Sequence, residues 1–292
     1  MTFNRYALFE SRTLAWRLFK RHHTHLNDIY WSYRTSFAHA FAGTRGHTES
    51  DATDAVFEFA KNNRRAAPTL GEWSANYLSF DRWTHMAAVV AIAGYLETFI
   101  AQIATAAIES DPSHVFGGGP KIDGAVYLKH NPKYDLYSHV EPLIRGDWQS
   151  RSAAYTRLFG SCPYSNPTTI SDLERLRTLR NDAGHSFGRD INSMSFAPAW
   201  LVQKLPNIAE KHLTALLAVA EDVAWKIESQ LATIVGQYEV VKVFHRWRPT
   251  STNLSASPRV LAKDFSVHFN ALTGTPYGKN PAIGLISYYE SL

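Results

Sequence analysis

The sequence predicts an all-α protein, and two segments with helical spacing carry that prediction. Between residues 208 and 241, apolar residues recur at steps of mostly three and four, which places them on one face of a helix. Residues 171–183 form a second amphipathic segment, which is rich in arginine. The chain shows no alternation of strand-like and helix-like segments of the kind that builds a parallel sheet. We therefore expect packed helices.

Helical patterns also fill the first part of the chain. Residues 5–41 predict one or two helices, and the capping residues and acids of 50–54 predict the start of another. The segment 68–71 predicts a break, after which Glu72 opens a long apolar helix. That helix should end before Pro112, because a proline disfavours helical geometry at the residue that precedes it.

Loops and shorter segments follow the apolar helix. Residues 114–135 are typical of a loop, 148–159 of a short helix, and 163–169 of a break before the arginine-rich helix. Residues 186–206 look irregular. The long apolar pattern then continues to about Trp247, where we expect the helical core to end.

The helical pattern weakens beyond Pro249. Residues 260–269 and 282–289 predict short strands or irregular packing around the glycine- and proline-bearing loop between them. We therefore divide the chain into three consecutive segments: an N-terminal helical extension (1–71), a helical core (72–247) and a C-terminal extension of irregular structure or short strands (248–292).

The composition favours a globular protein in the cytoplasm. Of the 292 residues, 45% are hydrophobic, which allows a sizeable buried core. The lone Cys162 excludes an intrachain disulfide and a CxxC metal site, and the first residues lack the apolar run of a signal peptide. The most apolar stretch, 86–108, is interrupted by Glu97 and Gln102. We interpret it as a core helix and expect no membrane partner.

The charge of the chain is mildly basic. A formal charge of +4 and a pI near 9.0 do not establish nucleic-acid binding by themselves. Basic residues nevertheless gather before Glu49, with aromatic residues among them, and such a mixture can hold RNA phosphates and stacked bases. The alternative is a solvated face with aromatic packing. The basic residues are Arg5, Arg12, Arg17, Lys20, Arg21, Arg34 and Arg45, and the aromatic ones are Tyr6, Trp16, Tyr30, Trp31 and Tyr33.

The hexad Arg180-Asn181-Asp182-Ala183-Gly184-His185 closes the arginine-rich helix and can carry chemistry. Arginine is a permanent cation suited to phosphate, and histidine exchanges protons near neutral pH. At about 100° per residue, Asn181 and His185 share a helix face, whereas Arg180 is offset by roughly 140° and must swing back. At a helix C-terminus the macrodipole favours imidazolium, which prepares His185 to act as an acid as well as a base.

In composition and setting, this hexad resembles the signature of the HEPN superfamily, helical proteins that include many metal-independent endoribonucleases. Residues 173–179 lead into the hexad, and 148–160 look like the helix that often comes before it in these families. Residues 95–99 are similar to the acid-bearing helix of HEPN cores. The resemblance covers roughly residues 72–247 and implies an antiparallel helical bundle.

Cleavage of RNA by its own 2′-hydroxyl needs a base, an acid and a cation beside the transition state. One hexad supplies one histidine, so the pairing of two hexads across a two-fold axis is a physical reason to expect a homodimer. HEPN nucleases are built in this way. The resemblance implies that His185 transfers protons, that Arg180 clamps the phosphate and that Asn181 orients one or both, without metal or cofactor. By analogy it also implies a toxin or antiviral defence role, with an antitoxin or other regulatory partner.

Glu97 is informative because it stands on a helix that is apolar nearly all round. A carboxylate in that setting should be buried and should need a partner, for which Arg177 or Arg180 is the natural candidate. The alternative interpretation places Glu97 at a gap that faces solvent.

Alternatives to the nuclease remain. The hexad can be structural, in a non-catalytic HEPN-like module that binds RNA or protein. Residues 184–188 also satisfy G-x-S-x-G, the nucleophile elbow of serine esterases, with Ser186 as nucleophile, but that motif needs a strand before it. The histidines of 22–25 lack further ligands for zinc, and the glycines of 117–121 lack P-loop spacing.

Overall fold

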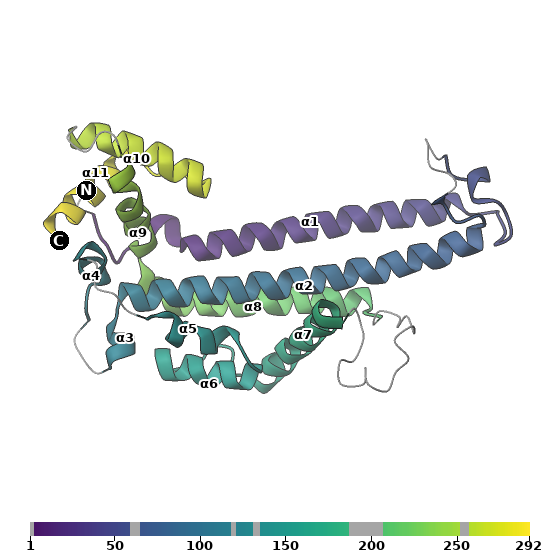
Figure 1. Cartoon of the computed structure of the whole chain (residues 1–292), viewed down its shortest axis with the longest axis horizontal. Helices are drawn as coiled ribbons and strands as arrows, with labels where there is room; N and C mark the ends of the chain where they lie inside the picture. The colour runs from purple at the N-terminus through teal and green to yellow at the C-terminus, as the bar shows by residue number, and fades with distance from the viewer. Residues whose placement is uncertain (1–2, 59–64, 118–120, 131–134, 187–206, 252–256) are drawn as a thin grey trace. The chain divides into compact units, whose positions relative to one another are not determined.

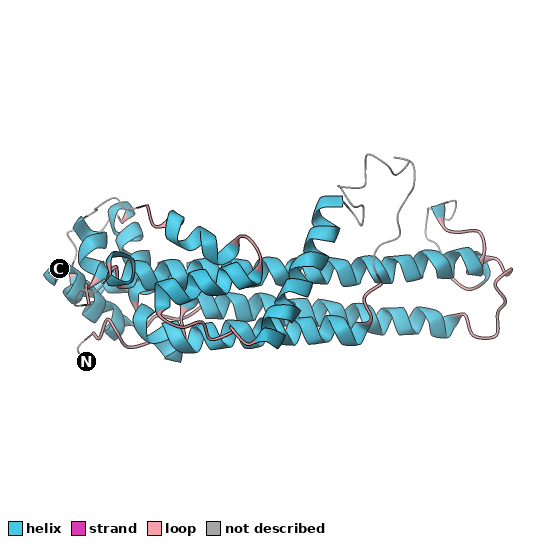
Figure 2. Cartoon of the chain, turned by 90° about the horizontal axis from the view of Figure 1, so that it is seen from below, coloured by secondary structure: helices cyan, strands magenta, loops and turns pink. Residues whose placement is uncertain are grey.

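The computed structural model describes residues 3–58, 65–117, 121–130, 135–186, 207–251 and 257–292, with backbone alone for 184–186. Helices account for the regular structure (Figure 1), and colouring by secondary structure shows helices joined by loops (Figure 2). No strand occurs in the described ranges, so the all-α prediction is confirmed. The α-helices are α1 (Leu14–Gly43), α2 (Leu70–Ser110), α3 (Ser113–Phe116), α4 (Gly124–His130), α5 (Tyr137–Ile144), α6 (Trp148–Phe159), α7 (Pro167–Ser186), α8 (Glu210–Val235), α9 (Tyr238–Trp247), α10 (Pro258–Thr273) and α11 (Lys279–Ser291).

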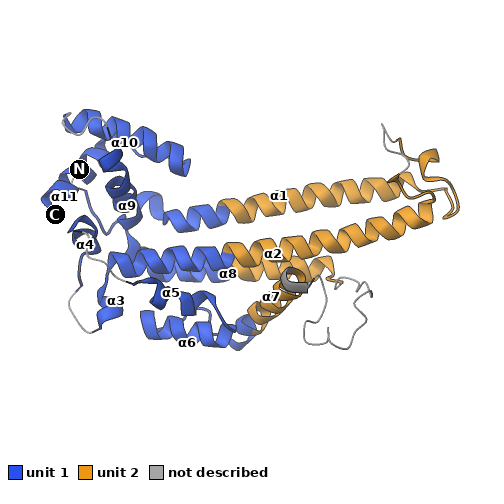
Figure 3. Cartoon of the chain, in the orientation of Figure 1, with its two compact units in different colours: residues 1–20, 96–170, 222–292 blue, residues 21–95, 171–221 orange. Residues whose placement is uncertain are grey.

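The chain forms two compact units, each assembled from separate stretches of sequence (Figure 3). Helices α1, α2, α7 and α8 each contribute residues to both units. The predicted division into three consecutive segments stays a prediction. Unit 1 comprises Met1–Lys20, Leu96–Ile170 and Asp222–Leu292, and unit 2 comprises Arg21–Tyr95 and Ser171–Glu221.

The C-terminal part of unit 1 is helical, and the strands predicted there are wrong. Leu261, Phe265 and Phe269 follow one another at four-residue steps on α10, and all three are buried. This is the spacing of one helix face. Phe265 meets Phe244 of α9 edge-on, with ring centroids 5.2 Å apart. Burial of this aromatic face against neighbouring helices outweighs the weak helix preference of aromatic residues.

The long helical pattern from 208 to 247 is divided into α8 and α9 by a glycine. Gly236 has a φ of +52°, a conformation that side chains disfavour. A Cβ at this position would lie 2.4 Å from the backbone oxygen of Arg5. The close approach lets Gln237 donate its backbone N–H to that same oxygen at 2.8 Å. The break therefore anchors the N-terminal segment of the chain.

Two carboxylates hold the N-terminus of α1 in unit 1. Thr13 caps the helix, since its Oγ1 accepts the backbone N–H of Trp16 at 3.1 Å. Glu228 of α8 accepts the N–H of Thr13 at 2.9 Å and its hydroxyl at 2.6 Å. Glu239 of α9 accepts the N–H of Leu14 at 2.6 Å and that of Ala15 at 3.1 Å. Both acids therefore stabilise amides that the helix leaves without internal partners.

Unit 2 is held together by rings from α1 and α2. Phe37 of α1 stacks on Tyr77 of α2, with centroids 5.0 Å apart and planes at 17°. One turn further along α1, Phe41 contacts Trp73 at 5.3 Å. Since the rings meet in this order, the two helices run antiparallel within the unit. Helix α7 adds two buried leucines, Leu173 and Leu176, to the interior.

Two shorter predictions need correction. The helix expected from residue 50 is reduced, within the described residues, to a 3-10 turn at Thr53–Ala55. Asp51 accepts hydrogen bonds from the backbone and hydroxyl of Thr48, and such local bonds compete with a helix. The loop expected over 114–135 contains most of the short helix α3 and the whole of the short helix α4. A long-range contact secures α4, because Lys129 donates to the backbone oxygen of Tyr289 at 2.9 Å.

Helix α2 runs from Leu70 to Ser110 and ends before Pro112, as predicted. By length and composition alone it is apolar enough to cross a membrane, with a mean hydropathy of 1.7 in its most apolar window. Half of that window is buried within the protein, and the core helix of a soluble protein passes the same test. The cytoplasmic location stays a prediction.

Candidate functional site at the end of helix α7

Helix α7 carries the hexad on its last turns. It begins at Pro167, where proline suits the first helical position, and Asn166 caps it by accepting the N–H of Thr168 at 2.9 Å. The buried Leu173 and Leu176 fix one face of the helix. The backbone stays helical through Ser186, so the predicted helix of 171–183 is confirmed and extends at both ends.

Arg180 and Asn181 contact each other directly. The Arg180 Nη1 donates to the Asn181 Oδ1 at 3.0 Å, and both side chains are half-buried. The adjacent amide thereby restrains a guanidinium that has several rotatable bonds. His185 follows Asn181 by one helical turn on the α7 backbone, and its side chain lies outside the described residues.

Arg177 lies one turn before Arg180 and is held within its own helix. Its Nε donates to the Glu174 Oε1 at 2.9 Å, and its Nη2 bonds the same oxygen. Both side chains are about one-third exposed, so this ion pair is partly solvated and contributes little to stability. It directs the Arg177 head group back along α7.

Glu97 has a partner that sequence reasoning missed. The Arg151 Nη1 of α6 donates to the Glu97 Oε1 at 3.0 Å. Arg151 is buried, also donates to the Gly146 backbone oxygen at 3.1 Å, and lies over the Trp148 ring at 4.6 Å. The Glu97 side chain is 17% exposed, so it is partly buried and paired. Glu97 belongs to unit 1, and its predicted pairing with Arg177 or Arg180 of unit 2 stays a prediction.

The N-terminal basic residues are largely engaged in internal contacts. Arg5 is buried and bonds Asp123, and Arg12 lies over the Trp225 ring at 4.4 Å. Arg17 pairs with Glu10 at 2.8 Å, and Arg34 pairs with Asp81 at 2.9 Å and with Glu210 at 2.5 Å. The contacts of these four arginines therefore favour the interpretation of packing and pairing within the protein over that of a surface that binds RNA.

The structure reveals a polar network in unit 2 around His85. The His85 Nδ1 lies 2.7 Å from the Ile208 backbone oxygen and its Nε2 lies 3.0 Å from the Tyr30 hydroxyl. The Tyr30 hydroxyl also donates to Glu210 at 3.3 Å, and Arg34 bonds that carboxylate. Burial, and then the Glu210 charge, raise the pKa of Tyr30, so the phenol stays protonated and acts as a donor.

This network holds the start of α8 against α1 and α2 within unit 2. Because the Tyr30 phenol stays protonated, it cannot serve as a catalytic base. A sequence signal existed, since His85 stands beside Met86 and Val89 on the buried face of α2. Its partners, however, come from segments far away in the chain. The sequence pattern around His85 therefore could not predict the network.

Two histidines of the segment 22–25 take part in packing contacts. His22 stacks on the Tyr95 ring at 4.8 Å, and the Nε2 of the buried His23 lies 3.2 Å from the Leu217 backbone oxygen. Within the ranges that the structure covers, no three His, Cys, Asp or Glu side chains gather as metal ligands would. Part of the glycine-rich segment 117–121 lies outside the described residues.

Comparisons with family models, with curated proteins and with solved structures found no match for this chain.

Proposed function

We propose that the protein is a metal-independent endoribonuclease whose site is formed by Arg180, Asn181 and His185 at the end of α7. The observation that carries the proposal is the 3.0 Å contact between the Arg180 guanidinium and the Asn181 side chain, on a helix that continues through His185. A restrained cation and a proton-transfer residue on the same helix are the two groups that this phosphate chemistry needs. The resemblance of the hexad to HEPN nucleases supports the same assignment.

The proposed reaction is internal transfer at phosphorus. A base removes the proton of the 2′-hydroxyl, the 2′-oxygen bonds to phosphorus, and the bond to the 5′-oxygen breaks as an acid protonates it. The products are a 2′,3′-cyclic phosphate and a 5′-hydroxyl. Arg180 stabilises the charge that develops on the phosphate oxygens, and Asn181 positions its guanidinium.

The proposal requires two copies of the chain. A single His185 cannot serve as base and acid in the same step, so we place two copies of α7 across a two-fold axis, each contributing one histidine and one arginine. A role in toxin–antitoxin or antiviral defence, with a neutralising partner, is part of the proposal by analogy alone.

A second candidate is a non-catalytic module that binds RNA or protein, and one observation favours it. Unit 2 exposes aromatic side chains, with Trp31 50%, Phe80 46% and Trp83 51% exposed. The rings of Phe80 and Trp83 lie nearly parallel, with centroids 6.2 Å apart. Exposed aromatic faces are typical of binding surfaces. The esterase interpretation gains no such support. The nucleophile elbow needs a strand before its serine, whereas a helix leads to Ser186.

The test is incubation of the purified chain with total tRNA and mRNA in EDTA, followed by analysis of the new RNA ends. We expect fragments that end in 2′,3′-cyclic phosphate, or in the monophosphate that its hydrolysis gives. Fragments with 3′-hydroxyl ends would contradict the proposed chemistry. RNA that is bound but stays intact would favour the binding module.

A further inference from the structure

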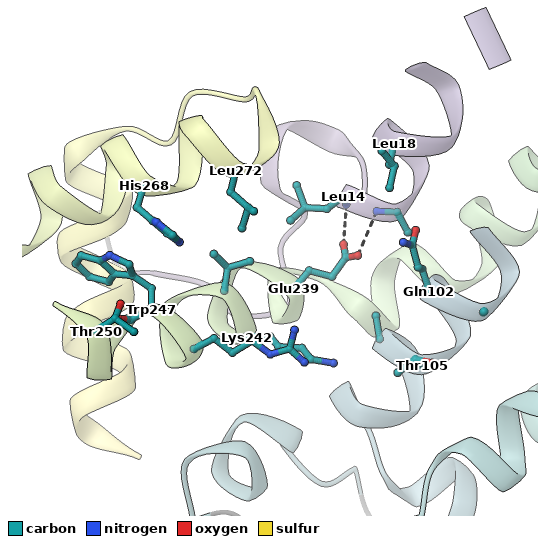
Figure 4. A pocket seen from close by; sticks show the side chains of 15 residues that line it. Leu14, Leu18, Gln102, Thr105, Glu239, Lys242, Trp247, Thr250, His268 and Leu272 are labelled. Atoms are coloured by element: carbon teal, nitrogen blue, oxygen red, sulfur yellow. Dashed lines mark hydrogen bonds between the residues drawn. The ribbon is translucent and has the colours of Figure 1, made fainter. Parts of the chain in front are cut away.

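Unit 1 contains a pocket of about 700 Å³ that the nuclease proposal does not use (Figure 4). Its volume lies within the range of pockets that hold small organic ligands. Four α-helices and a 3-10 turn at Arg248–Thr250 line it, all within the same unit. The α-helices contribute the start of α1, the later part of α2, α9 and α10. The walls therefore belong to one compact body.

Apolar side chains form much of the wall. Leu14 and Leu18 of α1, Val243 of α9 and Leu272 of α10 all line the pocket. Leu18 is 37% and Leu272 is 63% exposed, so both leucines present apolar surface to solvent. An apolar ligand that covered them would remove this surface from water and gain free energy.

The charges around the pocket leave one cation unbalanced. Lys242 is neutralised by Glu109, whose Oε1 it contacts at 2.7 Å. The Glu239 carboxyl accepts two backbone amides of α1. Burial raises the pKa of Glu239 to about 7, so this group carries only part of a negative charge at neutral pH. Arg246 also lines the pocket and is exposed, and no described residue forms a hydrogen bond or ion pair with it.

Neutral polar groups complete the lining. His268 of α10 stacks on the Trp247 ring, with centroids 5.9 Å apart. Gln102 and Thr105 of α2 also line the pocket, and in Figure 4 Thr105 and Lys242 lie on the opposite side of Glu239 from Leu272. A lining that combines apolar walls with a few polar groups matches a ligand with a charged head and an apolar body.

We propose that this pocket binds an amphipathic organic anion, namely an aliphatic carboxylate whose head group pairs with Arg246 and whose chain covers Leu14, Leu18 and Leu272. A carboxylate matches the guanidinium in shape as well as charge, because two parallel N–H···O bonds can form. A cationic or neutral ligand would leave Arg246 without an acceptor.

The test is calorimetric titration of the full chain with decanoate, and with decanol and decylammonium as neutral and cationic counterparts. We expect decanoate to bind saturably at one site, with decanol and decylammonium each at least about tenfold weaker, the range of a charge-assisted hydrogen bond. Equal affinity for decanoate and decanol, or no saturable binding of decanoate, would overturn the proposal.

Variants locate the site. Arg246→Gln should weaken decanoate binding by about tenfold or more, whereas Arg259→Gln, a matched change of an exposed arginine on α10 outside the pocket, should leave it unchanged. Val243→Trp should abolish binding by filling the pocket. Thermal unfolding of each variant shows whether it is folded. Full binding by folded Arg246→Gln or Val243→Trp protein would contradict the assigned position.

Discussion

At the scale of single residues, close approach of the backbone decides which glycines the fold requires. A Cβ on Gly124 would lie 1.6 Å from the backbone oxygen of Glu109, which leaves no room for any side chain. A Cβ on Gly94, within α2, would meet nothing within 4 Å. Both glycines lie in helices, but only Gly124 has no space for a side chain.

We predict that Gly124→Ala destabilises the protein by about 1–3 kcal/mol or more, because α4 must move away from α2. Gly94→Ala should stabilise it by up to about 1 kcal/mol, because alanine loses less conformational entropy in a helix. Chemical denaturation of both variants measures the two changes. A free energy of unfolding that Gly124→Ala leaves unchanged would show that α4 does not pack closely on the Glu109 carbonyl.

The candidate site was predictable at this scale only in part. The family resemblance implied that Asn181 orients Arg180 or His185, and in the structure the Asn181 side chain accepts a hydrogen bond from Arg180. Arg151, the partner that the structure gives Glu97, is 54 residues away on α6. The sequence does not reveal which side of α6 faces α2. Pairings of this kind depend on how helices pack, and periodicity within one helix says nothing about them.

At the scale of elements, the two carboxylates at the N-terminus of α1 link stability to pH. Burial raises the pKa of Glu239 to about 7 and also raises the pKa of Glu228. The mutual repulsion of the two acids adds to the Glu239 shift, whereas Lys242 opposes it. The folded state therefore holds protons that the unfolded state releases at lower pH.

We predict that the stability contributed by Glu239 and Glu228 decreases as the pH rises from about 4.5 to about 7.5, because at these two groups the folded state binds more protons than the unfolded state. His245, whose pKa burial lowers, contributes in the opposite sense. Because position 239 no longer titrates in the Glu239→Gln variant, its free energy of unfolding should fall less steeply with pH, or rise more steeply, than that of the unmodified protein. Urea unfolding at a series of pH values measures the slopes. Identical slopes for the variant and the unmodified protein would refute the Glu239 assignment.

Helices with continuous periodicity were predictable, and those fixed by distant contacts were not. Helix α6 occupies the predicted residues 148–159, and α2 ends where Pro112 requires. Helix α4 depends on the contact of Lys129 with Tyr289, 160 residues away, and was predicted as loop. For α10, the aromatic residues suggested strands, and the burial of the face that carries Leu261, Phe265 and Phe269 explains the helix.

At the scale of the whole molecule, the proposed chemistry requires two copies of the chain. We predict a particle of twice the 32.9 kDa chain mass at the concentrations at which RNA is cleaved. Sedimentation velocity measures this mass directly. Activity from a species that is monomeric at the assay concentration would contradict the composite site, since one chain supplies one hexad.

The central claim is that Arg180 and His185 cleave RNA. The most direct measurement compares tRNA cleavage in EDTA by the unmodified protein, by His185→Ala and Arg180→Ala, and by Arg175→Ala as a control on an exposed position of the same helix. All four proteins must give the same unfolding profile. We expect cleavage by the unmodified protein and Arg175→Ala, and a loss of at least about a hundredfold in the other two. Cleavage that persists in both His185→Ala and Arg180→Ala would contradict the account.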